Sequence, residues 1–195
     1  TLLLQVRPRP VIAATLPAML LCDVTNTGDG EEAFNLTGHI PQIIGNQVGL
    51  TVTFHTTQGQ AQAGNNAIAT PNAYNNTSNP QTVWVRIANA AGCFVVRPLT
   101  LQVNPLPQII DPTPFVVCST SNNATQGIFE LSQKNDEITQ ANPNYIVSYH
   151  LTQAQAQAGT NALAIPYTGS NGQTLFVRVQ DGTTGCVSLT TLTLT

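Results

Sequence analysis

Short stretches of alternating apolar and polar residues run through the chain and predict half-buried β-strands. The clearest is QTVWVRIAN at 81–89, in which Val83, Val85 and Ile87 should face a core. QTLFVRVQD at 173–181 shows the same pattern. We expect each stretch to form a strand with one buried face.

A second pair of strands carries a histidine at the same place. LTVTFHT at 50–56 and YIVSYHL at 145–151 alternate in the same way, with His55 and His150 on the side opposite the apolar residues. A general base needs a nucleophile or an acid beside it, and none recurs with either histidine. We interpret both histidines as structural hydrogen-bonding residues.

The paired strands belong to an internal repeat. FHTTQGQAQAGNNAIATP at 54–71 matches YHLTQAQAQAGTNALAIP at 149–166, at an offset of 95 residues without a gap. A fixed period of this size indicates tandem domains. Short strands with turn signals between them predict an all-β chain of two tandem immunoglobulin-like Greek-key β-sandwiches, with a short helical turn in each repeat.

The same comparison places the domain boundaries. TLLLQV at 1–6 matches PLTLQV at 98–103, which should be the last strand of a repeat. We therefore expect residues 1–6 to be the last strand of a preceding repeat. Repeat 1 then covers 7–104 and repeat 2 covers 105–195, with its last strand cut at the C-terminus, so we expect a longer natural protein.

Smaller elements follow from local signals. Phe34 and Phe129 should point inward from short strands at 33–36 and 128–131. SQKNDEITQA predicts a helical segment capped by Ser132. The matching TGHIPQIIGNQ contains a proline and predicts only a turn or two, whereas QAQAQAG predicts a helical turn that ends on a glycine C-cap.

Each repeat has one early and one late cysteine. Four cysteines allow three pairings, and only one of them gives each repeat its own bridge. We therefore predict two disulfides within repeats, formed by Cys22, Cys93, Cys118 and Cys186 in the order Cys22–Cys93 and Cys118–Cys186. Four free thiols are the alternative. Zinc is disfavoured because no CxxC spacing occurs, and disulfides would indicate an oxidising compartment.

Charged residues are sparse and exclude several classes of partner. Only 8% of residues are charged and the net charge is −3, whereas soluble proteins average about 25% charged residues. The chain has no basic patch for nucleic acid and no apolar run of the roughly 18 residues that would insert into a membrane. It also lacks G-x-S-x-G, P-loop and H-E-x-x-H motifs, so we predict that it is not an enzyme.

The combined motifs resemble a known family of repeats. They comprise a Cys-Asp start, DG-x-x-x-F-x-L-T, an aromatic-His strand followed by A-x-x-G-x-N-A-I, V-x-V-R-V and G-C. This pattern resembles the tandem Ig-like repeat units of large Bacteroidota, especially flavobacterial, cell-surface adhesin and gliding-motility-associated proteins exported by type IX secretion. The resemblance covers essentially both repeats and implies an extracellular location at the cell surface.

The resemblance also implies a possible calcium site. Members of this family carry an acidic stretch after the first cysteine, and repeat 1 keeps Asp23, Asn26 and Asp29 there. Oxygen ligands at such spacing suit Ca²⁺. Repeat 2 has STSNNATQG at this place and no carboxylate, so we expect no matching site there. In repeat 1 the alternative to a calcium site is a solvated polar loop. No other cofactor or metal is expected.

The sequence therefore favours a structural and adhesive segment of a long extracellular repeat protein, forming a rod or filament shaft. Its partners would be neighbouring repeats of the same polypeptide, together with a surface or glycan ligand. One alternative is a ligand-binding β-sandwich module for carbohydrate or another surface, and a second is an accessory domain of a secreted enzyme. Strand addition by TLLLQV to a neighbouring chain is the alternative to covalent tandem linkage. Arg86 and Arg178 should be structural and pair with a nearby carboxylate or carbonyl.

Overall fold

The computed structural model describes residues 6–119 and 125–195 and divides the chain into two compact units. The units are Thr1–Pro105 and Leu106–Thr195, called repeat 1 and repeat 2 below, and each is described by itself. The predicted last strand of a preceding repeat, residues 1–6, lies outside the described residues except for Val6.

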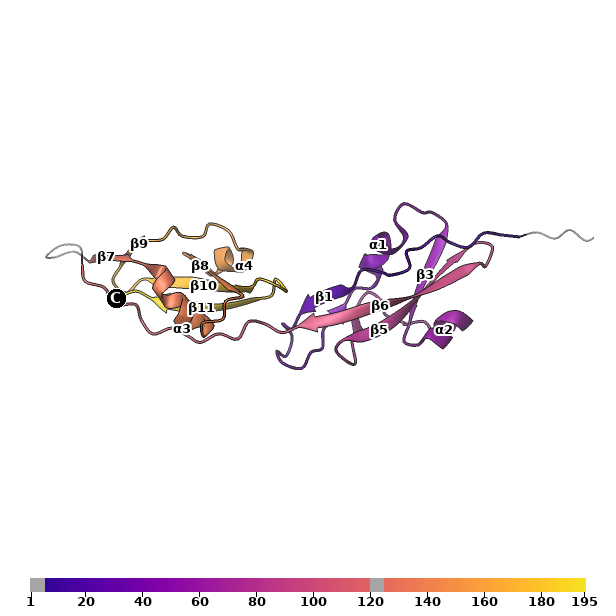
Figure 1. The fold of residues 1–195 in the computed structure, drawn as a ribbon, viewed down its shortest axis with the longest axis horizontal. Helices are drawn as coiled ribbons and strands as arrows, with labels where there is room; N and C mark the ends of the chain where they lie inside the picture. The colour runs from indigo at the N-terminus through magenta and orange to yellow at the C-terminus, as the bar shows by residue number, and fades with distance from the viewer. Residues whose placement is uncertain (1–5, 120–124) are drawn as a thin grey trace, which may run out of the picture. The chain divides into compact units, whose positions relative to one another are not determined.

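Repeat 1 is built mainly from strands (Figure 1). Its strands are β1 (Met19–Cys22), β2 (Ala33–Phe34), β3 (Leu50–His55), β4 (Tyr74–Asn75), β5 (Gln81–Asn89) and β6 (Phe94–Asn104). Its helices are the 3-10 helix η1 (Thr37–His39), α1 (Ile40–Ile44) and α2 (Gln58–Ala63).

The main sheet of repeat 1 has the strand order β1-β6-β5-β3. Strand β5 pairs antiparallel with both β6 and β3, whereas β1 pairs parallel with β6. Strands β2 and β4 form a second, small sheet. The side chains between these layers form one hydrophobic core, which includes Phe34, Leu36, Phe54 and Leu101.

Repeat 2 follows the same plan with its own core. Its elements are β7 (Gln126–Phe129), the 3-10 helix η2 (Leu131–Lys134), α3 (Asn135–Thr139), β8 (Tyr145–His150), α4 (Gln153–Ala158), β9 (Tyr167–Ser170), β10 (Thr174–Asp181) and β11 (Val187–Thr193). The sheets have the orders β11-β10-β8 and β7-β9. A parallel bridge between Phe115 and Leu194 stands where β1 pairs with β6 in repeat 1.

The strand predictions and the fold class are confirmed. Val83, Val85 and Ile87 are completely buried on β5, and Phe34 and Phe129 point into the two cores. Each repeat is an immunoglobulin-like β-sandwich with short helices. Burial of the alternate positions explains the pattern, because a strand with one face in a core needs apolar residues at every second position.

The glycine-capped helical turns are also confirmed. Thr57 and Thr152 cap α2 and α4 at their N-termini through the side-chain oxygen, and Gly64 and Gly159 end them with φ of +70° and +66°. A residue in this left-handed region favours glycine, because a Cβ is disfavoured there.

One predicted cap is wrong. Ser132 does not cap a helix, because its hydroxyl donates to the Glu130 carboxylate at 2.7 Å. The α-helix begins three residues later, at Asn135, after the 3-10 helix η2. The hydroxyl is thus engaged by a nearer acceptor on the preceding turn.

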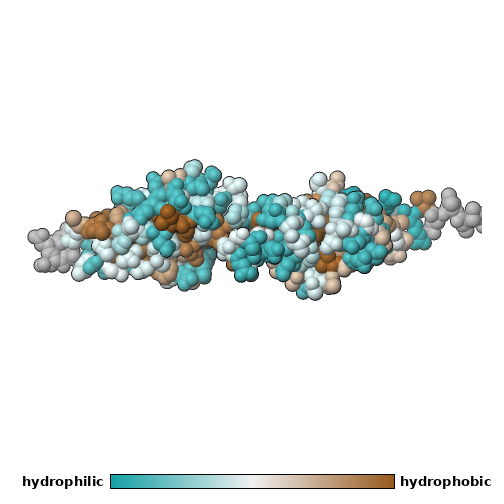
Figure 2. Space-filling view, turned by 90° about the horizontal axis from the view of Figure 1, so that it is seen from below, coloured by the Kyte–Doolittle hydropathy of each residue, from teal (hydrophilic) through white to brown (hydrophobic). Residues whose placement is uncertain are grey.

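The surface of each repeat is largely polar, with small apolar patches (Figure 2). Large apolar side chains that are exposed, such as Val48, occur singly, as is common in globular proteins. Within the described parts of the chain, none of the helices has the length and hydropathy needed to span a bilayer.

Candidate functional site

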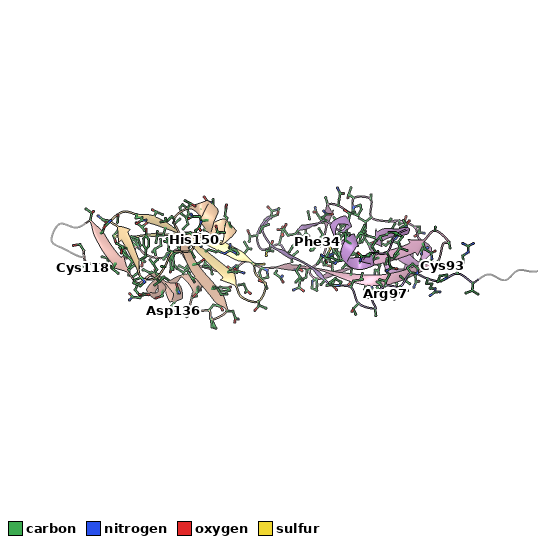
Figure 3. All side chains as sticks on the ribbon, turned by 90° about the horizontal axis from the view of Figure 1, so that it is seen from above. Phe34, Cys93, Arg97, Cys118, Asp136 and His150 are labelled. Carbon is green, nitrogen blue, oxygen red and sulfur yellow. The ribbon has the colours of Figure 1, made fainter. Side chains whose placement is uncertain are left out.

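The late cysteine of repeat 1 lies where β6 begins, an end of the repeat called the proximal end below. Cys93 lies in the turn between β5 and β6, and its backbone N–H donates to Asn89 Oδ1 at 3.0 Å. Its Sγ lies 3.6 Å from the carbonyl oxygen of Arg7, and Asn89 Nδ2 donates to the carbonyl of Pro8 at 2.9 Å. Cys93 therefore lies beside the segment through which the chain enters the repeat (Figure 3).

The early cysteine of repeat 1 lies at the opposite, distal end. Cys22 is the last residue of β1 and pairs in register with Asn104, the last residue of β6. The backbone N–H of Asp23 donates to the carbonyl of Asn104 at 2.9 Å. Because β6 is 11 residues long, its two ends are about 33 Å apart.

Repeat 2 places its cysteines in the same way. Cys186 directly precedes β11, and its carbonyl accepts from the N–H of Asp181 at 2.9 Å, so it lies at the proximal end. Cys118 follows Val117, whose N–H donates to the carbonyl of Thr195 at 3.0 Å. Cys118 thus lies beyond the far end of β11, at the distal end of repeat 2.

The two predicted disulfides within repeats are wrong. Cys93 and Cys118 are free thiols, whereas Cys22 and Cys186 are disulfide-bonded. A disulfide needs its Cα atoms within about 7 Å, and the length of β6 or β11 separates the two cysteines of each repeat. The prediction failed because β1 pairs with the last residues of β6, Leu101–Asn104, so Cys22 lies at the end of β6 remote from Cys93.

The sequence matches a family that is described by a disulfide between domains. The model of the family described as Flavobacterium inter-domain disulphide bond domain matches residues 18–107 and 114–195, one match in each repeat. The chain belongs to this family. The predicted resemblance to tandem repeats of flavobacterial proteins is confirmed at this level.

Comparisons beyond the family are distant. No curated protein sequence matches this pair of inter-domain disulphide bond domains. Among solved structures, the chain is similar to the human desmocollin-1 ectodomain, at 15% identity and a TM-score of 0.28, over 94% of this chain and 36% of that one. It is also similar to human mucin-like protocadherin EC1-2, at 13% identity and a TM-score of 0.24, over 95% and 97% of the two chains. Zebrafish RET cadherin-like domains 1 to 4 match at 13% identity and a TM-score of 0.29, over 96% and 50%.

In the first inter-domain disulphide bond domain, the loop after Cys22 is organised by two buried carboxylates. Asp23 Oδ2 accepts from the N–H groups of Gly28 at 2.7 Å and Gly30 at 3.4 Å. Glu32 Oε1 accepts from the N–H groups of Val24 and Thr25. Asp23 Oδ2 and Glu32 Oε1 thus accept hydrogen bonds from the backbone and are not available as ligands for a cation.

The calcium site at Asp23, Asn26 and Asp29 stays a prediction. Asp29 Oδ1 accepts from the N–H of Glu31 at 2.8 Å, and Asp23 Oδ1 is buried without a hydrogen-bond partner. In the described part of the chain, no group of three or more His, Cys, Asp or Glu residues is arranged to hold a metal ion. The matching loop of repeat 2 lies partly outside the described residues.

The paired histidines bind the backbone of each domain. His55 and His150 lie on the side of the strand opposite the apolar residues and are still only 1% and 0% exposed, because the segment after α2 or α4 covers that side. His55 Nδ1 lies 2.9 Å from the carbonyl of Asn65, and His150 Nδ1 lies 2.9 Å from that of Thr160. A carbonyl only accepts, so Nδ1 carries the proton, as expected for a structural hydrogen-bonding residue.

The paired arginines hold α2 and α4 against the sheets. Arg86 Nη1 donates to the carbonyls of Ala61 and Gln62, each at 3.0 Å. Arg178 Nη1 makes the same contacts to the carbonyls of Ala156 and Gln157 at 3.1 Å. Their contacts to carbonyls match the predicted structural role, because they satisfy groups left unpaired at the end of a helix.

A carboxylate orders the turn that carries the bonded Cys186. Asp181 Oδ1 accepts from the N–H groups of Thr183 and Thr184, both at 2.8 Å. The N–H of Thr184, followed by that of Thr183, lowers the pKa of Asp181 below its ordinary value. The charged form of Asp181 therefore stabilises this turn and the position of Cys186.

Proposed function

We propose that this chain is a structural segment of an extracellular repeat protein whose successive domains are joined by disulfides. In this arrangement, the distal cysteine of one domain bonds to the proximal cysteine of the next. Here the bond joins Cys22 of repeat 1 to Cys186 of repeat 2. The role of the chain would be non-enzymatic. The disulfide would hold each junction between domains covalently, in addition to the peptide chain.

The observation that carries this proposal is the placement of two cysteines at opposite ends of each repeat. Neither repeat can close a bridge by itself, since a full strand separates its cysteines. The two bonded cysteines, Cys22 and Cys186, come from different repeats. The family description, inter-domain disulphide bond domain, supports the same arrangement.

The free thiols complete the proposed pattern. Cys93 at the proximal end of repeat 1 is the partner for a distal cysteine of a preceding repeat. Cys118 at the distal end of repeat 2 is the partner for a proximal cysteine of a following repeat. A row of such repeats would form a rod or filament shaft at the bacterial surface, where oxidising conditions preserve disulfides.

We also propose that the longer protein is adhesive, is linked to gliding motility and is exported by type IX secretion. The low charge of the chain and its polar surface suit a shaft that stays dispersed in water. Neighbouring repeats would be the main partners, as in other repeat arrays.

Counting thiols in the folded chain of residues 1–195 tests the proposal. Trypsin cleaves after Arg86, Lys134 and Arg178, whereas the other three arginines precede proline and resist cleavage. Cys93 and Cys118 thus share the fragment 87–134. Alkylation of the folded, unreduced chain should add two labels, both on this fragment. No label would indicate that all four cysteines are bonded, four labels would indicate no bond, and either result would contradict the proposal.

A further inference from the structure

Repeat 1 has a cleft at its proximal end, beside the turn that carries Cys93. Its volume is about 270 Å³, and it lies between α2, the start of β6 and the segment that precedes β1. The residues lining it are Arg9, Gln58, Gln62, Phe94, Val95, Val96 and Arg97.

Positive charge gathers around this cleft. The chain has only six lysines and arginines, and two of them, Arg9 and Arg97, line the cleft, while Arg86 lies directly behind it. The carboxylates of repeat 1 all lie between residues 23 and 32, beside the distal end of β6. From Arg97 to that end is about 23 Å along the strand, well beyond the screening length of about 8 Å in physiological salt.

The walls of the cleft are held in place by contacts to the backbone. Arg97 Nε donates to the carbonyl of Ala13 at 2.9 Å, and Arg97 Nη2 donates to that of Ile12 at 3.5 Å. Arg86 lies over the ring of Phe94, with Cζ 3.5 Å from the ring centroid. The same arginine binds the last carbonyls of α2, so the helix that carries Gln58 and Gln62 is fixed above the strand.

These features are not needed by the fold, because repeat 2 lacks most of them. In the strand register, Val187 and Thr190 of β11 occupy the places of Phe94 and Arg97. The aligned sequence puts Leu106 at the place of Arg9. The two glutamines recur in α4 as Gln153 and Gln157, and Arg86 recurs as Arg178, so the features particular to repeat 1 are Arg9, Arg97 and Phe94.

We propose that this cleft binds an acidic sugar, a pyranose ring carrying a carboxylate or a sulfate group, within a glycan chain. The guanidinium groups of Arg9 and Arg97 would pair with the anionic group, as arginine does with planar and tetrahedral anions. Gln58 and Gln62 would hydrogen-bond to sugar hydroxyls. The ring of Phe94 and the neighbouring valines supply the apolar surface that sugar rings pack against. Such a site goes beyond the structural role and would let repeat 1 contact a polysaccharide.

Titration of the full chain with oligosaccharides tests this proposal. The probes are a chondroitin sulfate hexasaccharide, a polyguluronate hexasaccharide and neutral maltohexaose, with binding measured by calorimetry and by NMR shifts. We expect at least one acidic probe to bind and maltohexaose not to bind. Binding of the sulfated probe alone identifies a sulfate ester as the ligand group, and binding of the polyguluronate alone identifies a carboxylate.

Variants that introduce the residues of repeat 2 locate the site. Arg9→Leu removes one charge-assisted contact and Phe94→Val removes most of the apolar ring surface, and each should weaken binding of the acidic probe about tenfold. Lys134→Gln removes a positive charge from repeat 2 and should leave binding unchanged. Arg9 is exposed, so its replacement should leave the melting temperature unchanged.

Three results would overturn the proposal: no binding of either acidic probe, equal weakening by Lys134→Gln, or binding of inorganic sulfate as tight as that of the sulfated hexasaccharide. None of these results bears on the disulfides. The thiol count is made without any glycan, so failure here and failure of the proposed structural role are distinguishable.

Discussion

Pulling the oxidised chain by its two ends should lengthen it far less than pulling the reduced chain. A Cys22–Cys186 bond encloses residues 23–185 in a covalent loop. Force then passes from the N-terminal segment through the two sulfur atoms to the last residues of the chain. Every strand except β1 and β11 lies inside the loop, so most of each repeat cannot contribute its unfolded length.

The size of the effect follows from the length of the loop. At about 3.4 Å for each extended residue, the enclosed residues hold about 550 Å of contour length. The segments outside the loop hold only about 100 Å. Single-molecule force spectroscopy with handles on both termini should therefore show a total gain below about 100 Å before reduction. Adding a thiol reductant should release the remaining 550 Å or so in two unfolding events, one for each repeat.

A matched variant isolates the role of the bond. Cys22→Ser should show the full extension with or without reductant, because Cys186 then has no partner in the proposed pattern. Release of several hundred ångströms from the unreduced wild-type chain would refute the reasoning, since no loop of this size would then be closed.

Three further predictions concern the stability of the repeats. His150→Leu should lower the free energy of unfolding of repeat 2 by about 1–3 kcal/mol in urea titrations, because it removes the partner of the part-buried Thr160 carbonyl and Ser148 hydroxyl. An unchanged midpoint would contradict the structural role of the histidine. The Lys134 side chain, together with the N–H of Thr113, lowers the pKa of Glu137 to about 2. The ionised Glu137 carboxylate therefore contributes stability above its unfolded pKa of about 4.5, and this contribution is lost as the pH falls from there toward 2. Glu137→Gln should remove this part of the acid dependence of the melting temperature. Millimolar Ca²⁺ or EDTA should leave the melting temperature unchanged, since backbone N–H groups already bind the carboxylates after Cys22, and a rise of several degrees with Ca²⁺ would instead establish a site there.

The strands of both repeats could be predicted from the sequence because burial alone dictates their pattern. Val83, Val85 and Ile87 face the core, and the period-two alternation records that directly. The repeat also gave the glycine caps, since Gly64 and Gly159 follow the same QAQA segment and both need a left-handed backbone.

The cysteine pairing could not be predicted, because it depends on which end of β6 the short strand β1 lies beside. Spacing along the chain is nearly equal for the two predicted pairs, and it carries no information on which end of β6 that is. The length of the strand-like stretch after Cys93, FVVRPLTLQVN at 94–104, was the available signal. The two ends of such a strand are too far apart for a disulfide, so Cys93 can bond to the first cysteine only if that cysteine lies beside the start of the strand.

Burial of the histidines and formation of the cleft needed the tertiary structure for a similar reason. His55 lies on the polar side of its strand, and only the fold shows that the segment after α2 covers it. Arg9 and Arg97 are far apart in the sequence and meet because the segment before β1 packs beside the start of β6.

The most direct test of the proposed inter-repeat bond is a tryptic map of the unreduced protein, with free thiols blocked beforehand. Cys22 lies in fragment 1–86 and Cys186 in fragment 179–195. The account predicts that these two fragments are found as one cross-linked species that separates on reduction. Fragment 87–134 linked to 1–86 or to 179–195 would mean that Cys93 or Cys118 is bonded to Cys22 or Cys186, which contradicts a Cys22–Cys186 bond.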